Sequence, residues 1–202
     1  MKKISKTVGM ITFAVIVGAL SAFAWIELTD EITYSGLSVR LADTEDSVIT
    51  ISSTKTGSGT DEVHADSVMD EMIPCTSDDG KTFKDESGVK VHGEPYYLEK
   101  TFYIHANEAG HTISIEDIEL TNGEQDIAEA TRCAVTILGE TKIIEPTSDD
   151  LGGTFGNGLA LSTTDPNVAN IKVYFEGTDE SCTADNINDM DAIGIDVVLG
   201  AN

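Results

Sequence analysis

Short segments in which apolar and polar residues alternate constrain the fold of this chain most. The clearest runs from Tyr96 to Ala106, where Leu98, Phe102 and Ile104 share one phase. A period of two places alternate side chains on opposite faces of a β-strand. The same alternation predicts strands at 32–41, 47–53, 131–138, 169–176 and 193–199. Turn residues separate these segments and no βαβ rhythm appears, so we expect an all-β fold, a jelly-roll-like antiparallel β-sandwich.

Two details of strand arrangement follow from the same pattern. Only a short polar turn separates the segments 32–41 and 47–53, which are therefore predicted to form a hairpin. Between Thr112 and Leu120 the apolar phase changes after Ile115. A change of phase within one strand predicts a β-bulge at that point.

Two intervening segments are less regular. Met69, Met72 and Ile73 have helical spacing, which allows a short helix there. Residues 75–95 are charged and contain two turn signals, so they are predicted to form a surface insert with one or two short strands.

The start of the chain carries an export signal. Lys2, Lys3 and Lys6 precede an uncharged stretch over 7–26, which contains the motif Ala22-Phe23-Ala24. This pattern predicts a signal peptide over 1–24, cleaved to leave a β-sandwich domain over 25–202. The apolar length also fits an uncleaved N-terminal helix that anchors the chain in a membrane. Either way we expect a secreted or cell-surface protein that meets the membrane only through this segment.

The charge balance excludes one class of partner. The chain has 36 acidic and 12 basic residues, a formal net charge of −24. Such a charge repels phosphate backbones, so we expect no nucleic-acid binding. The acidity is typical of a solvated surface, and it also suits divalent cations.

Calcium is the predicted ligand, because it prefers carboxylate and amide oxygens. The cluster is Asp179, Asp185, Asn186, Asp189 and Asp191. A plain solvated turn is the alternative interpretation. A second acidic cluster, open to the same two interpretations, is Asp61, Glu62, Asp66, Asp70 and Glu71.

Three cysteines are expected to enter an oxidising compartment, where an odd number suggests one disulfide and one thiol. Cys75 and Cys182 lie in loop-like sequence, whereas Cys133 lies in a predicted strand. We therefore predict a Cys75–Cys182 disulfide and a buried Cys133. The alternative is that all three are reduced and serve as small apolar fillers.

Two stretches resemble a known family. One is the junction 22–39, with an aromatic residue in the export motif, a polar Asp step and a strand entered through Gly36. The other is the strand ending Val173–Phe175 followed by Glu-Gly-x-Asp-x-x-Cys over 176–182 and a final strand. Both are similar to the TasA/camelysin family of exported surface proteins of Gram-positive bacteria.

The resemblance implies a jelly-roll subunit that assembles into surface or biofilm-matrix fibres with copies of itself and with related surface proteins. In such fibres the N-terminal segment of one subunit completes a sheet of its neighbour, which an open sheet edge allows. The alternative is that this segment forms the subunit's own first strand. The expected donor residues are Trp25, Ile26, Leu28, Ile32 and Tyr34.

Catalysis has little support in the sequence. The resemblance also implies a possible metalloprotease, for which His92, His105 and His111 are the candidate zinc ligands, but no His-Glu-x-x-His motif occurs. No nucleophile lies in a recognisable motif either. We therefore expect a structural protein and not an enzyme. The alternatives are a monomeric cell-surface binding module held by the N-terminal helix and, third, a metallopeptidase.

Overall fold

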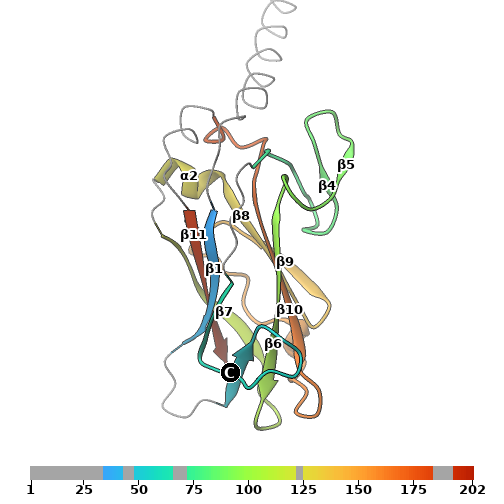
Figure 1. Cartoon of the computed structure of the whole chain (residues 1–202), viewed down its shortest axis with the longest axis vertical. Helices are drawn as coiled ribbons and strands as arrows, with labels where there is room; N and C mark the ends of the chain where they lie inside the picture. The colour runs from blue at the N-terminus through green and yellow to red at the C-terminus, as the bar shows by residue number, and fades with distance from the viewer. Residues whose placement is uncertain (1–33, 43–47, 66–71, 122–124, 184–192) are drawn as a thin grey trace, which may run out of the picture.

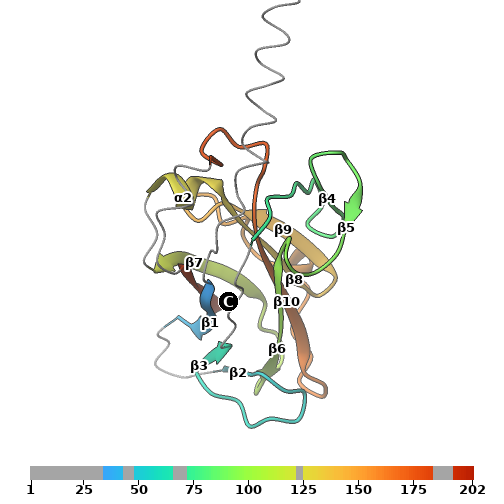
Figure 2. The ribbon, with the colours of Figure 1, turned by 45° about the horizontal axis from the view of Figure 1, so that its top comes forward.

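The computed structural model describes residues 34–42, 48–65, 72–121, 125–183 and 193–202, which form two large β-sheets packed around a core and a small two-stranded sheet beside them (Figures 1 and 2). This confirms the all-β prediction, while the predicted N-terminal helix lies outside the described residues. The strands are β1 (Tyr34–Leu41), β2 (Ile49–Ser52), β3 (Glu62–Ala65), β4 (Phe83–Lys84), β5 (Lys90–Val91), β6 (Leu98–Ala106), β7 (Ile113–Thr121), β8 (Thr131–Ile137), β9 (Glu140–Ile144), β10 (Asn167–Phe175) and β11 (Ile193–Ala201). The helices are α2 (Gln125–Ala130) and the 3₁₀ turn η1 (Gly156–Gly158).

The first sheet, sheet A, has the order β3-β1-β11-β7, and the second, sheet B, has the order β2-β6-β10-β8-β9. Every neighbouring pair is antiparallel except β1 and β11, which run parallel and lie side by side in Figure 1. The predicted antiparallel arrangement therefore holds for every neighbouring pair of the two sheets except this one.

The predicted hairpin between the first two strands is also wrong. β1 lies in sheet A between β3 and β11, so both of its hydrogen-bonding edges are occupied, whereas β2 pairs with β6 in sheet B. The intervening chain therefore passes from one sheet to the other. Length and polarity made this connection look like a turn, but neither reveals which strand is the partner.

Other local predictions have mixed outcomes. The bulge is confirmed, because Val198 pairs with Asp117 and Leu199 with Ile115, which leaves Glu116 without an opposite residue. The helix expected around Met72 is not present at Met72 or at the residue after it, which have no regular structure, and its first turn lies outside the described part.

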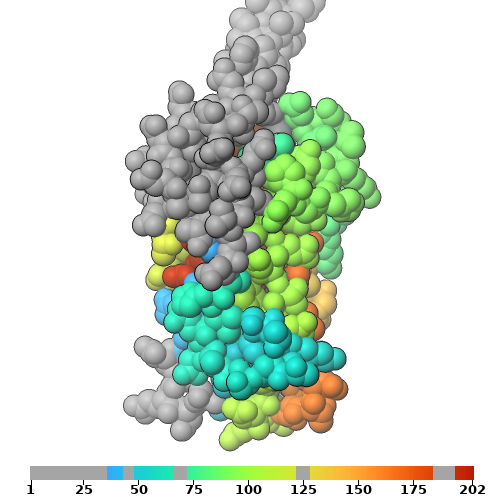
Figure 3. Space-filling view, viewed as in Figure 1, coloured from blue at the N-terminus to red at the C-terminus, as the bar shows by residue number. Residues whose placement is uncertain are grey.

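The segment predicted as a surface insert over 75–95 is best delimited in the structure as residues 76–97, which is called the insert from here on. It covers part of the outer face of sheet B. Phe83 of β4 is buried there, with its ring centroid 4.3 Å from that of Tyr97 and 5.0 Å from that of Tyr174 on β10. The insert forms a lobe beside the sandwich, as predicted and shown in green in Figure 3, but its aromatic residues belong to the buried cluster and pack against the outer face of sheet B. Sheet B is consequently buried on both faces at this end.

None of the helices in the described ranges has the length and apolar character to cross a bilayer.

Candidate functional site at the edges of the two sheets

One side of the sandwich is closed by continuous backbone pairing. Thr60 forms a bridge with Ile51 of β2 in sheet B, and the strand that follows it, β3, pairs with β1 in sheet A. The amide of Leu41 also donates to the carbonyl of Asp61 over 2.9 Å. The short segment from Thr60 to β3 therefore links the two sheets. The opposite side, between the end strands β7 and β9, is built differently.

On that side a loop covers only the first part of β7. Thr154 forms an antiparallel bridge with Ser114, and the amide of Phe155 donates to the carbonyl of Ile113 over 2.8 Å. We call residues 152–161 the strap. Phe155 is fully buried and belongs to the hydrophobic core between the sheets.

Lys142 of β9 holds the strap in place. Its ammonium group donates to the carbonyls of Gly152, Gly153 and Thr154, the last over 2.7 Å, and lies 4.4 Å from the ring centroid of Phe155. The side chain is only 11% exposed. A buried ammonium needs this many acceptors, because an unsatisfied charge away from water is costly. Sequence reasoning missed Lys142, which looked like an ordinary polar strand residue.

The second half of β7, from Asp117 to Thr121, has no further strand or bridge on its outer edge among the described residues. β9 likewise ends sheet B. Unpaired edge N–H and C=O groups are the groups to which an additional strand can bind. We therefore take residues 117–121, the free half of β7, as the candidate site.

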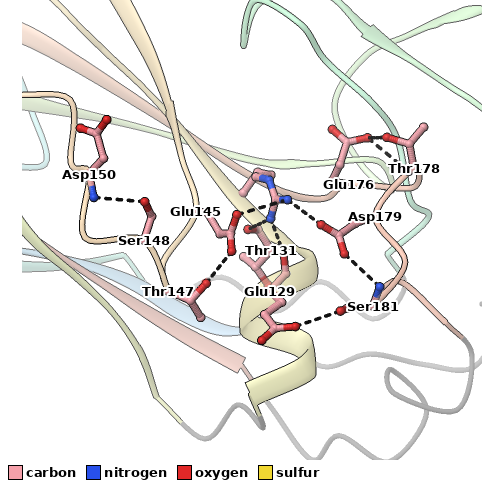
Figure 4. Close-up of polar contacts among 11 residues, drawn as sticks. Glu129, Thr131, Glu145, Thr147, Ser148, Asp150, Glu176, Thr178, Asp179 and Ser181 are labelled. Carbon is pink, nitrogen blue, oxygen red and sulfur yellow. Dashed lines mark hydrogen bonds and ion pairs between the residues drawn. The ribbon is translucent and has the colours of Figure 1, made fainter.

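An ion-pair cluster lies near the same end of the sandwich, where α2 leads into β8 (Figure 4). The Arg132 guanidinium lies 2.6 Å from the Asp179 carboxylate and 3.5 Å from that of Glu145. It also donates to the backbone carbonyls of Glu129 and Thr131. Arg132 is 16% exposed and Asp179 19%, so this pair is shielded from water more than a surface ion pair is.

Neutral donors complete the cluster. The Ser181 amide donates to Asp179 over 2.9 Å and its hydroxyl to the Glu129 carboxylate over 3.1 Å, while Thr147 donates to Glu145 over 2.6 Å. These bonds join α2, the end of β9 and the loop after β10. The cluster therefore fixes three connections at one end of the domain.

The structure assigns Asp179, one of the predicted calcium ligands, to other partners. One carboxylate oxygen of Asp179 accepts from Arg132 and the other accepts from the Ser181 amide, so both oxygens already have hydrogen-bond partners. The other predicted ligands, Asp185, Asn186, Asp189 and Asp191, lie outside the described residues. Within the described ranges no three His, Cys, Asp or Glu side chains come together in a way that could hold a metal ion.

The other acidic cluster is only partly described. Asp61 and Glu62 lie at the start of β3, and Glu62 is 3.3 Å from the His64 imidazole. Asp66, Asp70 and Glu71 lie outside the described residues.

The three candidate zinc ligands lie in different surroundings and have different partners. The His105 ring is hydrogen-bonded to the Ser52 hydroxyl at 2.8 Å, and His111 lies 4.0 Å from Glu108. His92 follows β5 in the insert. The described residues therefore give no support to a zinc-peptidase centre.

Of the expected donor residues, only the last is described. Tyr34 begins β1, where its backbone pairs with Ile193 of the same chain. It therefore belongs to the subunit's own first strand, as the alternative interpretation has it. Trp25, Ile26, Leu28 and Ile32 lie outside the described residues.

A shallow polar pocket of about 130 Å³ lies on the outer face of sheet A. Gly36 and Gly194 are paired neighbours that leave its floor without side chains, and Ser38, His64 and Asp196 lie at its rim. The Ser38 hydroxyl is hydrogen-bonded to Nδ1 of His64 at 2.6 Å. This hollow could hold a small polar group.

All three cysteines are buried free thiols. The burial predicted for Cys133 is confirmed, whereas the Cys75–Cys182 disulfide stays a prediction. Burial raises the pKa of Cys133 and that of Cys182 each to about 12. Such thiols are poor nucleophiles at neutral pH, which argues against a catalytic cysteine in the folded state.

Comparisons with protein-family models, with curated proteins and with solved structures found no match.

Proposed function

We propose that the chain is an exported structural subunit of a surface or biofilm-matrix fibre, with a jelly-roll-like sandwich of the TasA/camelysin kind. The segment that precedes β1 in one subunit adds as a strand to the free half of β7 in the next. The subunit works by joining copies of itself, needs no reactive centre and reaches the membrane only through its N-terminal segment. Calcium bound by the acidic loop after β10 is a secondary part of this proposal.

The observation that carries the proposal is the contrast between the two halves of β7. The strap occupies the first half, whereas the second half has no partner beyond β11 among the described residues. The apolar side chain of Ile118 is buried there, and that of Leu120 packs partly buried against the core. An added strand with alternating apolar residues would extend this surface.

The geometry of sheet A favours exchange between subunits. Tyr34 pairs with Ile193, and the next residue of β11, Gly194, pairs with Thr121. The start of β1 and the free end of β7 therefore lie at the same end of the domain. A segment that leaves one subunit there can reach an acceptor edge on a neighbour placed at that end.

Electron microscopy of the mature protein, beginning at Trp25, tests the proposal. We expect polymers from this protein and folded monomers from a variant that lacks residues 25–33, because the deletion removes the donor but leaves β1 intact. Unchanged polymers from the shortened variant would exclude strand donation by this segment.

A second variant tests the acceptor. Leu120→Lys places an ammonium group at the core-facing position of the free half, so we expect it to stop polymer growth. Glu119→Gln is the matched control, because this neighbouring side chain faces solvent and is 53% exposed. Circular dichroism should show native β-structure in both variants. Polymers from a folded Leu120→Lys protein would place the acceptor elsewhere.

The polar pocket on sheet A supports the second candidate, a monomeric cell-surface binding module. Its rim offers hydroxyl, imidazole and carboxylate groups, which suit a small polar ligand such as a saccharide. A mature protein that stays monomeric, and whose binding to a polysaccharide array is lost in Asp196→Ala, would favour this function over the fibre.

A further inference from the structure

The three cysteines differ in their placement. Cys133 lies on β8 opposite Val173 of β10, and both side chains face the interior between the sheets. Cys75 lies just before the insert, in a parallel bridge with Glu176 at the end of β10. Cys182 follows the turn that β10 enters. Two of the three cysteines therefore flank the same stretch of backbone.

Hydrogen bonds hold Cys75 to the two residues that flank Glu176. The Cys75 amide donates to the carbonyl of Phe175 over 3.0 Å, and its carbonyl accepts from the amide of Gly177 over 3.0 Å. Paired strands lie about 4.8 Å apart, so Cys75 is directly beside Glu176.

Two consecutive turns lie between Glu176 and Cys182. The amide of Asp179 donates to the carbonyl of Glu176 over 3.0 Å, and that of Cys182 to the carbonyl of Asp179 over 3.1 Å. Each such turn keeps its first and last Cα atoms within about 7 Å. The chain after β10 therefore turns twice between Glu176 and Cys182 and does not continue as an extended strand.

The electrostatic environment agrees with this arrangement. Burial is the main reason that the pKa of the Cys75 thiol is raised, followed by the negative charge of the Glu176 carboxylate. After burial, the charge that affects Cys133 is that of Arg132. Cys75 pairs with Glu176 and Cys182 follows that residue by two turns, whereas Cys133 lies on the inner face of β8. The backbone arrangement therefore favours Cys75 and Cys182 as the pair that bonds.

We propose that Cys75 and Cys182 form a disulfide once the chain is in an oxidising compartment, and that Cys133 stays a free thiol. The two thiols lose two protons and two electrons as the S–S bond forms. A dithiol–disulfide oxidoreductase outside the cytoplasm accepts them, and its own disulfide is reduced to two thiols. This inference rests on the export in the proposed function but not on polymer formation.

The bond would link the start of the insert to the loop after β10, and so fasten the insert to sheet B. It joins residues far apart in sequence, so it restricts the unfolded chain strongly. Because both thiols are buried and protonated in the folded state, oxidation should be fast during folding and slow afterwards. Once formed, the bond should resist reductants until the protein unfolds.

Thiol counting tests the inference on the mature protein, refolded in a glutathione redox buffer and then denatured. We expect one free thiol per chain, a mass lower by about 2 Da than the reduced protein, and a linked peptide pair that contains Cys75 and Cys182. We also expect Tm to fall by about 5 °C or more when the bond is reduced. Three free thiols, or a link that involves Cys133, would overturn the inference.

Single variants serve as controls. Cys133→Ala should keep the disulfide and leave no free thiol, whereas Cys75→Ala and Cys182→Ala should each leave two free thiols and lose the dependence of Tm on reductant. The same measurement on the Leu120→Lys monomer separates the two proposals. A bond in the Leu120→Lys monomer would show that the disulfide does not depend on assembly. A bond in an unsubstituted mature protein that stays monomeric would support the disulfide alone, and polymers from a fully reduced protein would support the fibre alone.

Discussion

The outer faces of the two sheets have opposite environments. On sheet B, the insert covers Tyr174 and Lys172 of β10, and Phe83 packs between aromatic rings. On sheet A, the outward residues Arg40 and Glu119 meet in an ion pair of 3.6 Å at which both side chains stay exposed. Sheet B thus has buried aromatic residues on its outer face at this end, whereas the outer face of sheet A carries a solvated ion pair.

The difference can be followed in the strands themselves. In β1, buried Leu37 and Val39 alternate with partly exposed neighbours, as expected of a sheet with one wet face. β10 alternates in the same way and then ends in three consecutive buried residues, Val173, Tyr174 and Phe175. A strand that loses its alternation towards one end indicates that something covers its second face there.

The largest effect is expected from Phe83→Ala. The change removes the ring that packs between Tyr97 and Tyr174, and deleting a buried aromatic side chain costs about 3–5 kcal/mol. Urea unfolding followed by circular dichroism measures the free energy of unfolding. Val89→Ala, at a site in the insert that is 59% exposed, is the control and should change little. Equal effects of the two changes would mean that the insert does not stabilise sheet B.

The next largest effect is expected from Arg132→Ala, beside the covered end of sheet B. The change leaves the mostly buried Asp179 carboxylate without its cation, which we expect to cost about 2 kcal/mol, below the full value for a buried pair because some exposure remains. Arg132→Lys should recover only part of this, since an ammonium group cannot reproduce the planar fork of the guanidinium. A neutral Arg132→Ala change would show that the cluster is not a stabilising contact.

A smaller, pH-dependent effect is expected within the insert. Hydrogen bonds from the amides of Thr82 and Lys81 lower the pKa of Asp79 from 3.8 to about 2. The folded-state pKa is depressed, so the contribution is complete above about pH 4 and is lost as the pH falls towards 2.

Hydrogen exchange at these two amides should therefore accelerate over that acidic range and not in Asp79→Asn, where the carboxylate is absent. The carboxylate is almost fully exposed, so the change in global stability should be small. Exchange that does not depend on pH, after correction for intrinsic rates, would contradict the assignment.

The smallest effect is expected on the outer face of sheet A. Arg40→Ala removes an exposed ion pair on sheet A, and such pairs contribute about 0–1 kcal/mol. We expect a change in the free energy of unfolding below about 0.5 kcal/mol that disappears in high salt. A cost comparable to that of Phe83→Ala would indicate that the outer face of sheet A is covered as well.

The sequence predicted local structure better than pairing. The alternation in β6 and β10 and the phase change near Glu116 are local signals, and the structure has strands and a bulge at these places. The partner of β1 is β11, which lies at the far end of the sequence, and no local pattern specifies it. The hairpin prediction was wrong because it assumed that neighbours in sequence are neighbours in the sheet.

The candidate site had the same limit. The acidic run after β10 suggested cation binding, but the cation that Asp179 meets is Arg132, which is 47 residues away in sequence. The free half of β7 is defined by where the strap stops, and the strap is placed by Lys142 through carbonyl contacts that leave no pattern in the sequence. Both features depend on contacts between distant segments, which composition and spacing do not encode.

The parallel pairing of β1 with β11 has a mechanical consequence. Tension applied to the chain ahead of Tyr34 and beyond Ala201 would pull the two strands lengthwise in opposite directions. Their inter-strand bonds, from Tyr34–Ile193 to Leu41–Leu199, would then share the load and break together and not one after another. Loading along this axis shears the two strands past each other. We expect the domain to withstand far more force in this direction than when its strands are unzipped from the side.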